Sequence, residues 1–253
     1  MRSSQAENIN SRFFDGHYKE IWRSLIPDGL TKAEIDFLID KGQLKPGDKV
    51  LDLMCGYGRH ALALARNGIQ VTAVDNLGAY VNEVREVSQR ENLVVTCIED
   101  DVIGYEPTGI FDLVICLGNN LSFFTREETE KLFSTIGSHT KQGGIFIANS
   151  WTIAEIVFKN FVTRTWSDVN GLRYLVDNKF FFNPTRIESE ITMIPNNGAE
   201  EKKKTVDYIY SVNETENTMM KFGLSMREIR SIPGKKKFTL GEPRAYFVAK
   251  KHQ

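Results

Sequence analysis

The stretch Val50-Leu51-Asp52-Leu53-Met54-Cys55-Gly56-Tyr57-Gly58-Arg59-His60 decides the fold of this chain. It begins with an apolar run typical of a buried strand, and its two glycines indicate a tight turn. A helical segment follows and ends at Asn67-Gly68, and a second apolar run, from Ile69 to Val74, then ends on Asp75. The pattern predicts a strand–helix–strand unit whose glycine-rich corner lets a ligand approach the backbone.

Two classes of cofactor bind at such a corner. Gly56-x-Gly58-x-x-Ala61, followed by Asp75 about 20 residues on, fits the dinucleotide fingerprint of a nicotinamide-dependent oxidoreductase. Asp52 opposes that interpretation, because a carboxylate beside the corner repels a pyrophosphate. The same carboxylate favours a cofactor that carries an ammonium and a sulfonium group, which S-adenosylmethionine does. Asp75 lies where a ribose-binding acid belongs, at the end of the second strand.

The segment Asp52 to Gly58 resembles the Asp-x-Gly-x-Gly-x-Gly motif of the class I S-adenosylmethionine-dependent methyltransferases, with Met54 at the first glycine. Its Cys-Gly-x-Gly-Arg-His form is similar to that of a bacterial subgroup acting mostly on small molecules. Asp101-Val102 and the stretch from Phe111 to Asn119 match further motifs of the family. The resemblance implies an α/β fold with a Rossmann-like, seven-stranded, doubly wound sheet. It also implies S-adenosylmethionine as cofactor, S-adenosylhomocysteine as product, and no metal.

The resemblance further implies which residues contact the cofactor. Asp75 would bind the ribose hydroxyls, and Asp101 the adenine amino group with Val102 over the ring, although any acid of residues 99–101 is a candidate. The N-terminal segment would fold over the cofactor and bring Tyr18 or Trp22 to it; the alternative is that these aromatics only pack against the core. The full set is Tyr18, Trp22, Asp52, Met54, Cys55, Gly56, Gly58, Arg59, Asp75, Asn76, Asp101, Val102, Leu117 and Gly118.

The rest of the chain predicts three parts. Residues 1–44 form an N-terminal helical cover, in which Thr31 and Glu34 make a capping box for the second helix. Residues 45–160 and 212–253 form the cofactor-binding domain. Residues 161–211 alternate and are rich in β-forming residues, which predicts an antiparallel β insertion after the fifth strand. We expect its aromatic side chains to cover the substrate site; the alternative is that they attach the insertion to the domain or form a homodimer contact.

Methyl transfer to a nitrogen or an oxygen of a small molecule requires an unprotonated acceptor. His17 and Tyr18 are candidates for the base, although His17 can equally be an ordinary surface histidine. Asn119 is a candidate for orienting the substrate, with a helix cap or an Asx turn as the alternative. The stretch after the fourth strand lacks the Asn-Pro-Pro-aromatic motif of methyltransferases that act on adenine or amide nitrogens. A protein that binds the cofactor without catalysis is a further alternative, because function resides in the site and not in the fold.

Composition limits the partners. The chain has 253 residues, a formal net charge of -1 and 41% hydrophobic residues, as expected of a soluble globular protein. This charge gives no reason to expect a nucleic-acid partner. No apolar run is long enough to span a membrane, and residues 1–7 carry no apolar signal core. The three cysteines are too scattered for a disulfide framework or a zinc site. A cytoplasmic enzyme with a small-molecule substrate is therefore expected.

Overall fold

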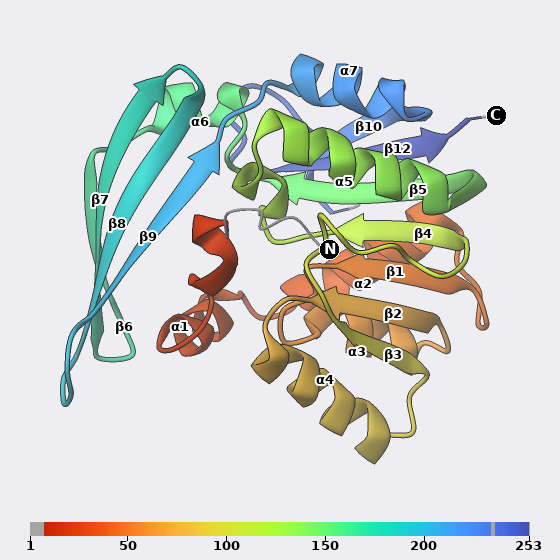
Figure 1. The fold of residues 1–253 in the computed structure, drawn as a ribbon, viewed down its shortest axis with the longest axis horizontal. Coiled ribbons are helices and arrows are strands. Elements are labelled where there is room, and N and C mark those ends of the chain that lie inside the picture. Colours follow the sequence, from red (N-terminus) through yellow and green to blue (C-terminus); the bar gives the residue numbers. More distant parts are fainter. Residues whose placement is uncertain (1–7, 234–235, 253) are drawn as a thin grey trace, which may run out of the picture.

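The computed structural model describes residues 8–233 and 236–252, and its largest element is a mixed sheet (Figure 1). The strand order is β11-β10-β12-β5-β4-β1-β2-β3. Strands β1 to β5 pair in parallel, whereas β12 is antiparallel to both β5 and β10. The strands are β1 (Lys49–Leu53), β2 (Gln70–Asp75), β3 (Val95–Glu99), β4 (Phe111–Cys116), β5 (Thr140–Ser150), β10 (Leu224–Ile232), β11 (Lys236–Lys237) and β12 (Ala245–Lys251). This confirms the predicted seven-stranded sheet, to which β11 adds a two-residue edge.

Helices cover both faces of this sheet. Helices α2 (Leu30–Gly42), α3 (Arg59–Arg66) and α4 (Gly78–Arg90) pack on one face, where Leu38, Leu64 and Val84 are completely buried. Helices α5 (Arg126–His139) and α7 (Val212–Lys221) cover the other face. The sheet is therefore buried on both sides, which explains why its central strands read as continuous apolar runs rather than alternating ones.

The start of α5 agrees with its sequence and the start of α2 does not. Thr125 and Glu128 form the expected capping box of α5. In α2 the N-cap is Gly29, without a side-chain hydrogen bond, so the predicted Thr31–Glu34 capping box is wrong. Glu34 instead turns into the protein, where only 1% of it is exposed. The capping-box spacing does not decide the position of Glu34, because buried hydrogen-bond donors from α3 and β12 compete for its carboxylate.

The predicted insertion is a separate antiparallel sheet that lies beside the edge of the domain at which the parallel strands end (Figure 1). Its order is β6-β7-β8-β9, with β6 at Arg164–Val169, β7 at Leu172–Phe182, β8 at Thr185–Pro195 and β9 at Glu201–Tyr208. Helix α6 (Ala154–Asn160) connects it to β5. Asn170-Gly171 lies in the turn between β6 and β7, as the sequence predicts.

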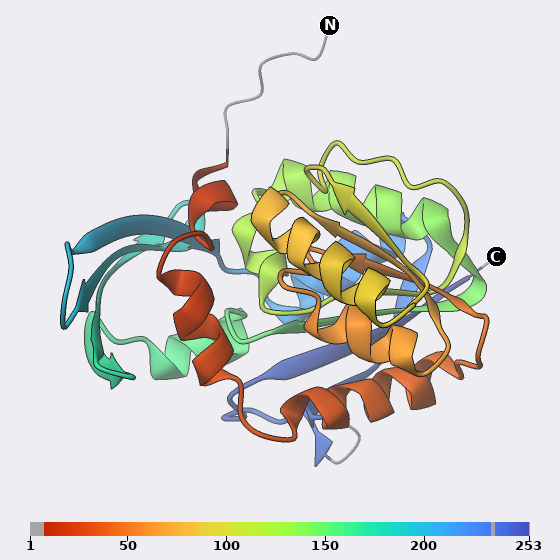
Figure 2. The ribbon, with the colours of Figure 1, turned by 90° about the horizontal axis from the view of Figure 1, so that it is seen from below.

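The N-terminal segment lies between the insertion sheet and the domain (Figure 2). It consists of the short helix η1 (Ile9–Arg12) and of α1 (Tyr18–Leu25). Phe13 and Ile21 pack with Ile191 and Met193 of β8 into a small core of their own. Residues 1–7, on which the expectation of no signal sequence rests, lie outside the described residues. Within the described ranges, none of the helices combines the length and the apolarity of a membrane span.

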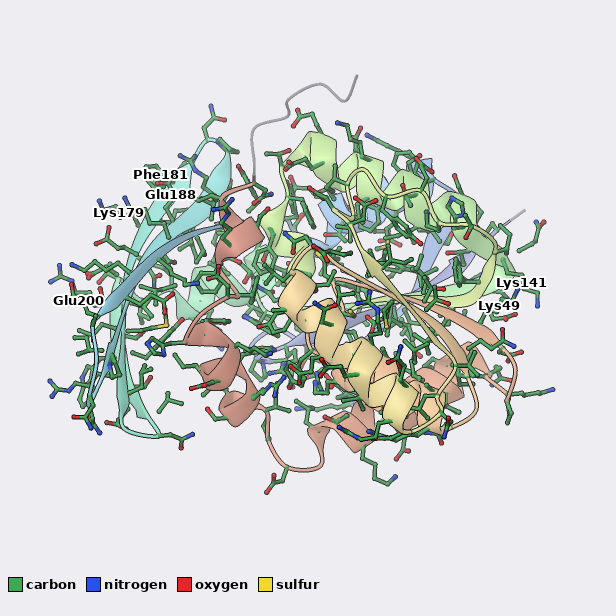
Figure 3. All side chains as sticks on the ribbon, turned by 60° about the horizontal axis from the view of Figure 1, so that its bottom comes forward. Lys49, Lys141, Lys179, Phe181, Glu188 and Glu200 are labelled. Atoms are coloured by element: carbon green, nitrogen blue, oxygen red, sulfur yellow. The ribbon has the colours of Figure 1, made fainter. Side chains whose placement is uncertain are left out.

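The outer face of the insertion sheet carries mostly charged side chains. Arg164 pairs with Asp177 and Lys204 with Glu190, and cross-strand register places Asp177 opposite Glu190. Lys179, Phe181 and Glu188 lie at the far side of this sheet from the domain (Figure 3). Such a face is typical of solvent-exposed sheets. It gives no support to a homodimer contact across this face, which stays an untested prediction.

Candidate functional site

A cavity of about 620 Å³ lies at the carboxyl ends of the parallel strands. Residues that directly follow β1, β2, β3 and β4 line it, and the N-terminal segment closes one side. This is the position at which open α/β sheets bind ligands, and the volume is ordinary for a small-molecule site. Of the predicted cofactor-contacting residues, the lining includes Trp22, Met54, Cys55, Gly56, Arg59, Asp75, Asn76, Asp101, Val102, Leu117 and Gly118.

The glycine corner has the backbone conformation that its sequence requires. Met54, Gly56 and Gly58 all have positive φ angles, of 58°, 56° and 77°. A Cβ on Gly56 would meet nothing within 4 Å, and Gly56 lines the cavity. A Cβ on Gly58 would lie 2.5 Å from a methyl carbon of Val84. Gly58 is therefore required for packing α3 on α4; it is not among the described lining residues, and its contact with the cofactor stays a prediction.

Asp75 connects the corner to the end of β2. Its Oδ2 accepts a hydrogen bond from the Gly56 backbone N–H at 2.8 Å, and its Oδ1 accepts one from Leu77 at 3.0 Å. Burial raises the pKa of Asp75, and the backbone hydrogen bonds oppose that rise. The carboxylate thus shapes the corner while lining the cavity. Asn76 also lines it and donates to the Ser11 carbonyl of the N-terminal segment.

Asp52 lies behind the corner and is not among the described lining residues. Only 1% of it is exposed, and its Oδ2 has no hydrogen-bond partner in the described part of the chain. Burial, followed by the negative charge of Asp75, raises the pKa of Asp52 to about 8, although Arg59 acts in the opposite direction. A buried, unpaired carboxylate fits a ligand that carries positive charge and disfavours an anionic one. The residues present therefore fit S-adenosylmethionine.

The acids after β3 divide into two groups. Asp100 and Asp101 line the cavity together with Val102. Glu99 does not, because its carboxylate lies against the start of α4, where it would be 2.7 Å from a Cβ on Gly78. Asp101 accepts a hydrogen bond from the Ile103 backbone N–H at 2.9 Å through one oxygen. Of the three acids, only Asp100 and Asp101 are therefore among the described lining residues.

The N-terminal segment is tied across the cavity by polar contacts. The Asn10 side-chain amide donates to the Val206 carbonyl at 2.8 Å and accepts from the Val206 N–H at 3.0 Å, as a neighbouring strand would. Tyr80 donates to the Phe14 carbonyl at 2.7 Å. Asn10, Phe14 and Trp22 line the cavity. The segment therefore joins the insertion sheet to the cofactor-binding domain above the site.

The three predicted catalytic residues lie elsewhere, since none of them is among the described lining residues. The backbone N–H of His17 bonds to Glu201. Tyr18 packs in an aromatic cluster with Phe13 and Phe14, and burial raises its pKa strongly.

Asn119 is 4% exposed, and its amide is fully occupied. Its Oδ1 accepts from Ser150, Trp151 and Thr152, and its Nδ2 donates to Ser122, Thr152 and Asp207. Asn119 precedes the short helix η2 (Asn120–Phe123) without a side-chain cap, so its side chain makes neither the helix cap nor the Asx turn of the alternative interpretation and instead joins this turn to the end of β5.

A buried network beside the cavity was missed by the sequence reasoning. Glu34 accepts hydrogen bonds from Arg59, from Tyr246 at 2.7 Å and, through Oε2, lies 3.0 Å from His60 Nε2. Burial alone would raise the pKa of Glu34, but His60, Arg59 and Tyr246 together lower it to about 2. His60 lines the cavity. The only sequence feature that pointed to His60 was its position in the first turn of the helix that follows the glycine corner.

Comparisons with known proteins agree with this geometry. Residues 50–144 match the family of methyltransferase domains. A glycine/sarcosine N-methyltransferase of Halorhodospira halochloris is 23% identical over 145 residues, which are 56% of this chain and 54% of that protein. A ubiquinone biosynthesis O-methyltransferase of Rickettsia typhi is 28% identical over 125 residues, or 48% of this chain and 50% of that protein. The chain thus spans about half the length of these curated relatives.

Solved structures resemble nearly the whole chain. An S-adenosylmethionine-dependent methyltransferase from Clostridium acetobutylicum superimposes with a TM-score of 0.79 at 20% identity, covering 93% of this chain and 96% of that one. CalS10, an amino pentose methyltransferase from Micromonospora echinaspora solved with S-adenosylmethionine bound, gives a TM-score of 0.70 at 16% identity, covering 94% and 97%. At such identities the likeness shows the fold, including the predicted insertion.

Proposed function

Because this chain belongs to the class I S-adenosylmethionine-dependent methyltransferases, we propose that it transfers a methyl group to a nitrogen or oxygen atom of a small molecule. S-adenosylmethionine is the cofactor of this family. The observation that carries the proposal is the cavity at the carboxyl ends of the strands, where Gly56 offers open backbone and Asp75 an acid at the end of β2. Such a combination suits a nucleoside with a cationic tail.

The roles of individual residues are proposed from their positions. Asp75 binds the ribose hydroxyls, and Asp100 or Asp101 binds the adenine amino group, while Val102 covers the ring. Asp52 stabilises the positive charge from behind the corner. Trp22 covers the cofactor from the N-terminal segment. Tyr18 stays outside this set, because it packs within the aromatic cluster of the segment.

The protein's contribution to the reaction is mainly positional. S-adenosylmethionine supplies a methyl group that its sulfonium already activates. The residues of the chain hold donor and acceptor in line and exclude water, which are large contributions to the rate of such reactions. The N-terminal segment closes one side of the cavity, and the insertion packs on that segment without contributing to the described lining.

The relatives guide the choice of acceptor. The name of one similar protein states a nitrogen of glycine or sarcosine, that of a second states an oxygen acceptor, and that of a third states an amino pentose without the atom. We therefore propose a small polar acceptor and leave nitrogen and oxygen as outcomes of the test.

Two measurements test this function. Isothermal calorimetry with S-adenosylmethionine, S-adenosylhomocysteine and NADH should show binding of the first two and none of the third. A mass-spectrometric assay should then follow methyl transfer to glycine, sarcosine, an amino pentose and a catechol. Binding of NADH alone would refute the cofactor, and binding of S-adenosylmethionine with no methylated product from any acceptor would favour a non-catalytic cofactor-binding protein.

A further inference from the structure

We propose that His60 is a catalytic residue that accepts the proton lost by the methyl acceptor, and that Glu34 is the residue that positions its ring. The inference deepens the proposed function and rests on it. His60 is a histidine that both lines the cavity and has a buried carboxylate as a fixed partner. His17, which the sequence offered as a candidate for this task with an ordinary surface histidine as the alternative, is not among the described lining residues.

The geometry fixes which nitrogen of His60 is free. Glu34 is 1% exposed and ionised, so it can only accept hydrogen bonds, and it lies 3.0 Å from His60 Nε2. The proton of the neutral ring must therefore sit on Nε2. Nδ1 is then a bare lone pair, and it has no partner among the residues that the structure describes. His60 lines the cavity, and the proposal requires that its ring present Nδ1 to a group bound there.

The charges around His60 keep its ring neutral and make protonation reversible. Glu34 faces it from α2, Arg59 from α3 and Tyr246 donates to the same carboxylate from β12. Burial lowers the pKa of His60 below its usual 6.5, Arg59 lowers it further and Glu34 opposes both. At pH 7 the imidazole is therefore an unprotonated base. When it takes a proton, the ionised Glu34 beside it balances the new charge.

The step balances in atoms and electrons. The lone pair of the acceptor nitrogen or oxygen forms a bond to the methyl carbon, while the bond between that carbon and sulfur breaks and its electron pair stays on sulfur. The acceptor's proton passes to Nδ1 of His60. The proton returns to solvent after the methylated product leaves. No oxidant, metal or further reactant is needed.

Substituting His60 by glutamine separates the base from the structural role. In His60→Gln the side-chain amide can still donate to Glu34, but no basic nitrogen remains. We expect kcat with the best acceptor to fall about 100-fold or more, while the Kd for S-adenosylmethionine stays within about threefold. His139→Gln, at the end of α5 and outside the described lining, is the matched control and should keep the wild-type kcat. A tenfold weaker cofactor affinity at unchanged kcat in His60→Gln would show that His60 binds the methyl donor instead, and would overturn the proposal.

The pH profile gives a readout that a merely structural role does not move. In the wild type, kcat should decrease at pH values below the pKa of His60. This decrease at acid pH, the acid limb of the profile, should be absent in His60→Gln. Glu34→Gln should shift the limb to lower pH, because the carboxylate raises the pKa of His60. Circular dichroism of both variants checks that they fold. An identical acid limb in the wild type and in His60→Gln would refute the assignment.

One measurement does not depend on finding the acceptor. Nitrogen-15 NMR of the four histidines, with His60 identified by its loss in His60→Gln, should show a neutral ring protonated on Nε2 at pH 7. A ring protonated on Nδ1, or a charged ring at pH 7, would overturn the inference. Failure of the proposed function is distinct, because it shows in the wild type as no cofactor binding or no methylation of any acceptor.

Discussion

Asp52 should strengthen the binding of S-adenosylmethionine and, at the same time, lower the stability of the protein when no ligand is bound. Its carboxylate is 1% exposed, and one oxygen has no hydrogen-bond partner in the described chain. The change Asp52→Asn keeps the shape and removes the charge. We expect the variant to be more stable than the wild type in the absence of ligand and to bind S-adenosylmethionine more weakly. Replacing a residue with only a structural role would not raise the stability of the ligand-free protein while lowering its affinity for S-adenosylmethionine.

The magnitude follows from the pKa of Asp52. Its rise from 3.8 to about 8 corresponds to a cost of roughly 6 kcal/mol for the ionised form once the pH exceeds 8. Because the folded-state pKa is raised, the contribution of this acid to stability is fully present below pH 3.8 and is lost as the pH rises through 8. The amide of asparagine also needs hydrogen bonds, so we expect a net gain of about 2 kcal/mol at pH 8.

Thermal unfolding of the ligand-free protein between pH 5 and pH 8.5 measures this gain. For a chain of this size, Asp52→Asn should raise the Tm by about 5 °C at pH 8 and by less at pH 5. Calorimetry should show at least tenfold weaker binding of S-adenosylmethionine. Asp112→Asn is the control, because Lys141 and the Lys49 N–H stabilise that carboxylate and its loss should only destabilise. A Tm gain that does not grow with pH would refute the argument.

Three further predictions follow from the cavity. Gly56→Ala should weaken cofactor affinity with little loss of stability. Gly58→Ala should lower the free energy of unfolding by about 1–3 kcal/mol, because the new Cβ meets Val84. Adding Val84→Ala to Gly58→Ala should restore part of that free energy, which chemical denaturation measures. Asn10→Ala removes both hydrogen bonds that attach the segment to β9 and should speed cofactor release in stopped-flow measurements; an unchanged off-rate would exclude a covering role. Asp75→Ala should lower S-adenosylmethionine affinity tenfold or more by calorimetry, and unchanged binding would contradict the ribose assignment.

The parts of the fold that the sequence predicted share one property, which is local periodicity. Apolar runs of five or six residues followed by glycine or an acid located β1, β2 and β4, and alternation located the insertion. The lining of the cavity followed from the same information, because parallel strands place their carboxyl ends at one edge. Positions such as Asp75 could therefore be assigned before any tertiary contact was known.

The errors concern residues whose partners are distant in sequence. Glu34 has the spacing of a capping box with Thr31, but three donors, from Arg59, His60 and Tyr246, outweigh a backbone cap worth about 1 kcal/mol. The bases predicted in the N-terminal cover, His17 and Tyr18, are not among the described residues that line the cavity, and their catalytic role stays a prediction. Nothing in a single sequence shows that residue 34 will meet residue 246.

The insertion and the N-terminal segment pack together as one unit. Phe13 and Ile21 share a core with β8, and Asn10 pairs with both backbone groups of Val206 on β9. Deleting residues 163–209 would thus remove the insertion and also expose the apolar face of α1, so a loss of activity in that truncation would not isolate substrate selection. Point changes on the inner face are the sharper test. Tyr174→Ala leaves the strand register intact, and it should alter the preference among acceptors if the insertion selects the substrate, while cofactor affinity stays within about threefold.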